Sequence, residues 1–137
     1  MPTQFLRRRL RLAILAPAVL LLTQTGTPAA QGTRNFSVAA HKYAFAVAGA
    51  SSPEIRVTQG DLVQVTFSAD DIPHSFTTMA DRGQDDHYRI NRRAEPGKPA
   101  TFEFRADKAG KFPIRCTLTI DDRCHDMEAW IIVDPKK

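Results

Sequence analysis

The sequence has few of the features that mark membrane, fibrous or catalytic chains. It contains two cysteines and one tryptophan among 137 residues, and it has no heptad pattern, internal repeat or low-complexity tract. Its apolar run Leu12–Leu22 has eleven positions, whereas a membrane-spanning helix needs about 20. We therefore expect no retained membrane segment. Because no Ser-His-Asp order, nucleophile elbow or paired carboxylates are recognisable, we also expect that the protein is not an enzyme.

The first 32 residues have the organisation of an export signal. Four arginines lie in the first twelve residues, the apolar run follows, and small and polar residues occupy Thr23–Gly32. This order is typical of a secretory signal peptide. We therefore predict a cleaved signal over residues 1–32, a mature domain over residues 33–137, and a periplasmic or secreted location.

The charge of the predicted mature domain is balanced. The whole chain has 19 Lys and Arg against 15 Asp and Glu, and a formal net charge of +4. Without the four arginines of the signal, 15 basic residues face 15 acidic ones. The positive charge of the whole chain therefore gives no support for a nucleic-acid partner.

Short segments with β-strand character, separated by glycine, proline and aspartate, fill the mature chain. Apolar residues alternate over Leu62–Phe67 and Thr101–Arg105, and an apolar segment occupies Met127–Val133, where Trp130 is expected in the core. Residues Phe36–Phe45 alternate and then slip, as in one edge strand with a bulge. Seven or eight such strands predict an all-β sandwich or barrel. Greek-key connections would bring loops that are distant in the sequence to one end of it.

Imidazole and sulfur donors fall in two of the predicted loops. His74 lies in the segment Asp70–Phe76, and Cys116, Cys124 and Met127 lie between the last two predicted strands. Thiolate and thioether donors prefer Cu(I), and imidazole suits copper in either redox state. Zinc sites use cysteine and histidine but seldom a thioether. The donor set therefore indicates copper.

The same loops leave alternatives open. An exported protein with two cysteines commonly forms a disulfide, so Cys116 and Cys124 could be bonded to each other in an interaction domain that binds no metal. His125 is an alternate ligand to Cys124. Adjacent side chains in an extended segment point in opposite directions, so one of the two is expected to face the site and the other to face solvent. Four carboxylates flank the two loops and are expected to form a charged rim: Asp70, Asp71, Asp121 and Asp122.

At these residues the chain resembles the cupredoxins, particularly the small exported members and the copper domain of cytochrome oxidase subunit II. The similarity runs from Phe36 to Val133. It is carried by four segments: VTQGDLV from Val57, DIPHSF from Asp71, AGKF from Ala109, and C-x7-C-x2-M from Cys116. The resemblance implies a cupredoxin-type Greek-key β-sandwich of seven or eight strands.

The resemblance also implies a site for one copper ion. Ile120 stands where the oxidase domain has its second bridging cysteine, and Cys124 stands where that domain has a histidine. Because the second bridging thiolate is missing, a mononuclear site is expected rather than a dinuclear one. The implied ligands are His74, Cys116, Cys124 and Met127, with His125 as the alternate fourth ligand.

Two functions are compatible with such a site. The resemblance implies copper binding outside the cytoplasm that serves one-electron transfer to a redox protein partner. The alternative is periplasmic Cu(I) binding, buffering or delivery to a copper-transfer partner without redox turnover, because a second thiolate favours Cu(I).

Overall fold

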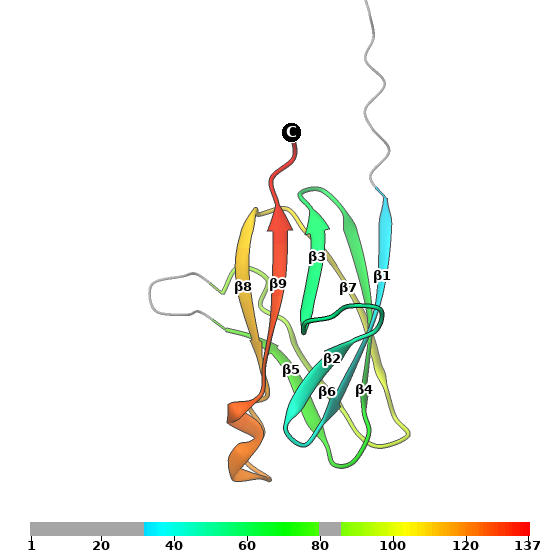
Figure 1. The fold of residues 1–137 in the computed structure, drawn as a ribbon, viewed down its shortest axis with the longest axis vertical. Coiled ribbons are helices and arrows are strands. Elements are labelled where there is room, and N and C mark those ends of the chain that lie inside the picture. Colours follow the sequence, from blue (N-terminus) through cyan, green and yellow to red (C-terminus); the bar gives the residue numbers. More distant parts are fainter. Residues whose placement is uncertain (1–31, 80–85) are drawn as a thin grey trace, which may run out of the picture.

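The computed structural model describes residues 32–79 and 86–137. The predicted export signal therefore lies outside the described residues, apart from Gly32. Nine strands and one short 3-10 helix form the regular structure of the described part (Figure 1). Their bounds are β1 (Thr33–His41), β2 (Ala44–Val47), β3 (Glu54–Thr58), β4 (Leu62–Ala69), β5 (His74–Thr78), β6 (Asn91–Ala94), β7 (Ala100–Arg105), β8 (Gly110–Arg115), η1 (Asp122–Asp126) and β9 (Glu128–Asp134).

The strands form a sandwich of two sheets, which confirms the predicted fold class. One sheet has the order β2-β1-β4-β7 and the other β3-β9-β8-β5-β6. The chain crosses between the sheets several times, so that β1 pairs in parallel with β4 and β3 pairs in parallel with β9. The strand count exceeds the predicted seven or eight because β2 and β6, with four residues each, are too short for a clear alternating pattern.

Side chains that alternate along the strands fill the space between the sheets. In β4, Val63, Val65 and Phe67 are fully buried. Rings from the two sheets meet there, because Phe76 of β5 packs edge-on against Phe67 at 5.7 Å and against Phe102 of β7 at 5.1 Å between ring centroids. Each buried apolar side chain of this size stabilises the fold by about 1.5–3 kcal/mol. This core fixes the position of β5, which begins at the candidate site.

Two local expectations are wrong. Residues Phe36–Phe45 are not one bulged strand but a hairpin, in which β1 ends at His41 and β2 begins at Ala44, so the slip in the pattern marks a turn. Trp130 is only partly buried, because the neighbouring positions on β9 point into the core. Its ring lies on the outer face of the sheet, with the ammonium of Lys111 4.1 Å from the ring centroid.

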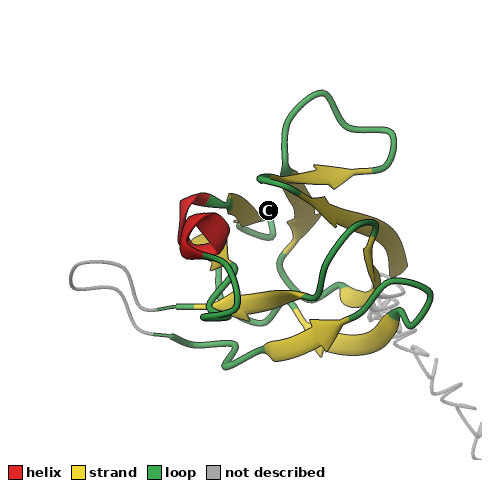
Figure 2. Ribbon diagram, turned by 90° about the horizontal axis from the view of Figure 1, so that it is seen from below, coloured by secondary structure: helices red, strands yellow, loops and turns green. Residues whose placement is uncertain are grey.

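The strand pairing brings the two predicted ligand loops to one end of the sandwich. Strand β8 is antiparallel to both β5 and β9, and its last residue, Arg115, pairs with Thr77 of β5 and with Glu128 at the start of β9. Cys116, which follows β8, therefore lies beside the start of β5. Helix η1 lies at that end, between β8 and β9 (Figure 1), and Figure 2 views the molecule from it, with η1 in red. In the described part of the chain, no helix has the length and hydrophobicity needed to cross a membrane.

Candidate metal centre

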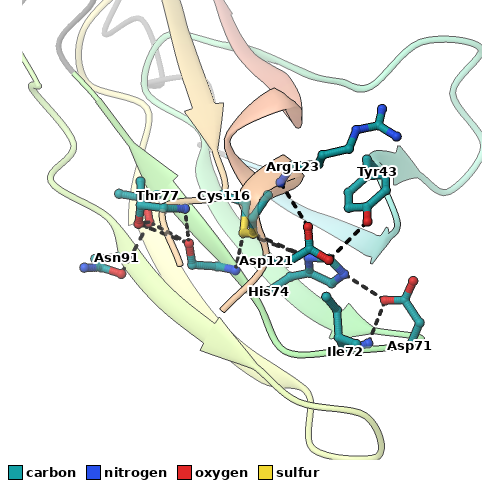
Figure 3. The surroundings of a disulfide bond; sticks show 12 residues. Tyr43, Asp71, Ile72, His74, Thr77, Asn91, Cys116, Asp121 and Arg123 are labelled. Atoms are coloured by element: carbon teal, nitrogen blue, oxygen red, sulfur yellow. Dashed lines mark hydrogen bonds and ion pairs between the residues drawn. A yellow bond between two sulfur atoms is a disulfide. The ribbon is translucent and has the colours of Figure 1, made fainter. Parts of the chain in front are cut away.

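The site consists of one imidazole and two sulfur atoms from three separate elements. His74 is the first residue of β5, Cys116 directly follows β8, and Cys124 lies in η1. The Nδ1 atom of His74 is 3.9 Å from the Sγ atom of Cys116 and 3.8 Å from that of Cys124. All three residues are completely buried. The structure therefore brings together the histidine and both cysteines that the sequence singled out. Figure 3 shows His74 beside Cys116.

The two cysteines form a disulfide in this structure, which is the alternative that the sequence left open. Their Cα atoms are 5.3 Å apart, and eight positions separate them in the sequence. A cysteine binds a metal through its thiolate, so Cys116 and Cys124 can act as ligands only after the disulfide is reduced.

The three residues fit copper once the sulfur atoms are free. Donors that share a four-coordinate ion at about 2.0–2.3 Å lie about 3.5 Å from one another. The two distances from His74 to the sulfur atoms are close to this value. Imidazole suits both redox states of copper, and thiolate favours Cu(I). The residues present could therefore hold copper with little movement of the histidine.

Met127 and His125 differ in their surroundings. Met127 is fully buried at the end of η1, and its backbone N–H donates to the carbonyl oxygen of Cys124 at 3.2 Å. His125 is exposed, although it lies between these two buried residues in the sequence. The geometry thus brings Cys124, and not the alternate His125, to the imidazole of His74.

Hydrogen bonds from the start of β5 hold the loop that begins at Cys116. The backbone N–H of Ser75 donates to the Sγ atom of Cys116 at 3.4 Å. The hydroxyl oxygen of Ser75 accepts from the backbone N–H of Thr117 at 2.8 Å, and the two hydroxyls are 3.2 Å apart. A donor directed at the sulfur favours its charged form, so the contact to Cys116 would stabilise a thiolate after reduction.

Asp71 contacts the opposite side of the His74 ring. Its Oδ1 atom is 2.8 Å from Nε2 of His74 and accepts from the backbone N–H of Ile72 at 2.7 Å, while Oδ2 accepts from the N–H of Lys42 at 2.6 Å. Burial raises the pKa of Asp71, but the hydrogen bonds from Lys42, His74 and Ile72 outweigh this effect and hold the pKa at about 2. Asp71 is therefore a carboxylate at neutral pH.

Asp121 supports η1 from its N-terminal side. Its Oδ1 atom accepts from the backbone N–H of Arg123 at 2.9 Å, which caps the helix, and its Oδ2 accepts from the Tyr43 hydroxyl at 3.1 Å. The guanidinium of Arg123 lies 4.2 Å from the centroid of the Tyr43 ring (Figure 3). Burial and the hydrogen bond to Asp121 raise the pKa of Tyr43.

Three of the four carboxylates expected to form a charged rim, Asp70, Asp71 and Asp122, are exposed, and Asp121 is partly buried. Asp71 and Asp121 also hold the two loops of the site. The sequence contained a signal for the contact between Asp71 and His74, because Asp71 stands three residues before His74. It contained no signal for the contact between Tyr43 and Asp121, which are 78 positions apart.

Comparisons with solved structures agree with this architecture. The periplasmic domain of subunit II of cytochrome oxidase (CoxB) of Bradyrhizobium japonicum matches with a TM-score of 0.59 and 17% identity, over 75% of this chain and 85% of that one. Auracyanin A, a "blue" copper protein of Chloroflexus aurantiacus, matches with a TM-score of 0.58 and 15% identity, over 75% of this chain and 100% of that one. The chain has the cupredoxin fold.

A third cupredoxin match is a complex. It is a mixed disulfide intermediate between the thioredoxin-like protein TlpAs and subunit II of cytochrome c oxidase, with a TM-score of 0.59 and 16% identity over 75% of this chain and 83% of that one. This chain also spans 65% of the length of a heme-copper terminal oxidase chain that it matches. No protein-family model and no curated protein matches the sequence.

Proposed function

We propose that this protein is an exported cupredoxin that binds one copper ion through His74, Cys116, Cys124 and Met127 and transfers single electrons to a redox protein partner. The observation that carries the proposal is the fully buried cluster in which Nδ1 of His74 lies 3.9 and 3.8 Å from the two sulfur atoms. The proposal includes the export signal over residues 1–32 and a role without enzymatic activity.

The way the donors are held supports electron transfer. His74 begins a strand whose side chains pack in the core. The next residue, Ser75, donates its backbone N–H to Cys116 and accepts a hydrogen bond from the N–H of Thr117. Copper, when bound, supplies a one-electron redox couple to such a site. Because strand pairing and the core hold the imidazole, this part of the ligand set would rearrange little between the two oxidation states.

The disulfide implies a preceding reduction step, and we propose a thioredoxin-like dithiol protein as the reductant. Both sulfur atoms are buried, so the loop that carries them must open before a thiolate of this partner can attack one sulfur of the Cys116–Cys124 disulfide. The attack forms a mixed disulfide, which the partner's second thiol then resolves. Two electrons and two protons pass to the cysteine pair, and the partner leaves as a disulfide. The structural match to a cupredoxin domain in a mixed disulfide with a thioredoxin-like protein supports this choice.

The cysteine pair also favours a second candidate function, which is Cu(I) binding, buffering or delivery without redox turnover. Two thiolates and a thioether prefer Cu(I). The sulfur atoms are close enough to bond to each other. A protein disulfide that takes two electrons from the thiolates would convert them to the Cys116–Cys124 disulfide, become a dithiol itself, and leave the metal without these sulfur ligands. A partner that accepts Cu(I) would then replace the electron-transfer partner.

Anaerobic copper titration of the mature protein tests the proposal. We expect two free thiols after reduction, uptake of one copper ion by the reduced form, and no uptake by the disulfide form. After oxidation, an optical band from thiolate to copper and a paramagnetic signal are expected. Failure of the reduced protein to bind copper would reject the proposal. A reversible potential with fast electron exchange would favour electron transfer, and irreversible loss of copper on oxidation would favour the second function.

A further inference from the structure

The imidazole of His74 has different partners at its two nitrogen atoms. Nε2 lies 2.8 Å from the Oδ1 atom of Asp71, and Nδ1 faces the sulfur atoms of Cys116 and Cys124. A carboxylate can only accept hydrogen bonds, so Nε2 must carry the proton. In a neutral ring this leaves the lone pair on Nδ1, on the side where the two sulfur atoms lie.

Asp71 is itself fixed in place by the backbone. Its two oxygens accept from the N–H groups of Ile72 and Lys42 at 2.7 and 2.6 Å, so the carboxylate connects the turn between β1 and β2 to the loop before β5. Its side chain is 33% exposed, whereas that of His74 is fully buried. Asp71 therefore lies between solvent and the buried ring and offers the ring a rigid acceptor.

We propose that Asp71 is the positioning residue of the copper centre, which accepts the Nε2 proton of His74 and so directs the Nδ1 lone pair toward the metal. The inference rests on the proposed copper site. A metal-binding histidine commonly donates its second ring N–H to a carboxylate, which fixes the tautomer and the ring orientation and raises the basicity of the ligand nitrogen. Loss of such a partner typically weakens metal binding by about 10- to 100-fold.

The first test measures the tautomer of His74 in the reduced, metal-free protein by two-bond ¹H–¹⁵N NMR spectra. We expect the Nε2–H tautomer in the wild type and a mixture of tautomers in Asp71→Ala. Asp71→Asn retains a carbonyl oxygen that can accept from Nε2 and should retain most of the wild-type tautomer. Asp70→Ala removes a neighbouring exposed carboxylate and serves as the control.

The second test measures Cu(I) affinity by competition with a chromophoric chelator. Asp71→Ala should bind Cu(I) about 10- to 100-fold more weakly than the wild type, Asp71→Asn should recover part of the loss, and Asp70→Ala should be unchanged. Thermal unfolding of each metal-free protein identifies a variant that fails to fold. If Asp71→Ala does not fold, the comparison rests on the Cu(I) affinity of Asp71→Asn, which should be weaker than that of the wild type.

The outcomes separate this inference from the proposed function. If the reduced wild type takes up copper but Asp71→Ala and Asp71→Asn match it in tautomer and affinity, the positioning role is wrong and the copper site remains. An Nδ1–H tautomer in the wild type would also overturn the role. If the reduced wild type takes up no copper, the proposed function fails, and the role of Asp71 toward copper fails with it.

Discussion

The hydroxyl of Tyr43 donates a hydrogen bond to the carboxylate of Asp121 at 3.1 Å, and this contact joins the turn between β1 and β2 to the loop that carries both cysteines. The adjacent residue, Lys42, donates its backbone N–H to Asp71, the partner of His74. One turn of the four-stranded sheet therefore contacts both loops of a site whose donors lie at the start of β5, directly after β8, and in η1. The relative position of these loops depends on this turn.

Tyr43→Phe should loosen the cysteine loop without disturbing the core. We expect a lower free energy of unfolding, because one hydrogen bond is lost, together with faster copper dissociation. Stopped-flow transfer of copper to a chelator measures the rate. The matched control is Tyr88→Phe, which removes a hydrogen bond to the carbonyl of Lys108 on a different part of the fold. Equal dissociation rates in the two variants would contradict the role of Tyr43.

Substitution of Cys124 and of His125 tests which of the two is the fourth ligand. Because Cys124 is buried beside His74 and His125 is exposed, Cys124→Ser should weaken copper binding more than the roughly 10- to 100-fold loss typical of outer-sphere changes. His125→Ala should bind copper as the wild type does. Chelator competition on the reduced proteins measures both affinities. The reverse pattern would make His125 the ligand.

The same loop should be stabilised by the disulfide in the oxidised protein and by the metal in the reduced protein. Cross-linking two residues eight positions apart stabilises a folded chain by about 2–3 kcal/mol. The reduced, metal-free protein should therefore be less stable than the disulfide form by this amount, and copper should restore the stability of the reduced form only. Denaturant unfolding of the three states measures the differences. If copper stabilises the disulfide form equally, it binds elsewhere on the protein.

Much of the fold and of the candidate site could be predicted from the sequence, and there are physical reasons why the remaining contacts could not. His74, Cys116 and Cys124 could be singled out because their residue types and their places between strands are local properties of the chain. Whether the two sulfurs bond to each other could not be decided, because a disulfide and a shared metal both require sulfur atoms that lie close together. The contact between Tyr43 and Asp121 could not be found, since it depends on how the two sheets pack.

Prediction from the sequence has a similar limit for residues at the surface. Trp130 lies in an apolar segment that reads as core, yet β9 alternates so that its neighbours take the inward positions. Asp71 is one of four carboxylates that the sequence assigns to the surface, and in the structure its contacts with the His74 ring and with the N–H groups of Ile72 and Lys42 distinguish it from Asp70. Composition and periodicity indicate which residues form a strand or loop, whereas the contacts of a single side chain follow from the fold.

The last prediction concerns acid. The pKa of Asp71 is about 2 in the folded protein, below its ordinary value of 3.8, so its contribution to stability is fully present above about pH 4 and is lost as the pH falls toward 2. Because the side chain is one-third exposed, solvent screening reduces this contribution to on the order of 1 kcal/mol. The stability advantage of the metal-free wild type over Asp71→Asn should therefore narrow between pH 5 and about pH 2.5.

Denaturant unfolding at several pH values measures this difference, and Asp70→Asn controls for the loss of one negative charge at the same end of the sandwich. A stability gap between the wild type and Asp71→Asn that is constant with pH would mean that the carboxylate gains nothing from His74, Lys42 and Ile72 in the folded state. The charge of Asp71 would then not help to hold the ring of His74, and the position of this ring would depend on the packing of β5 alone.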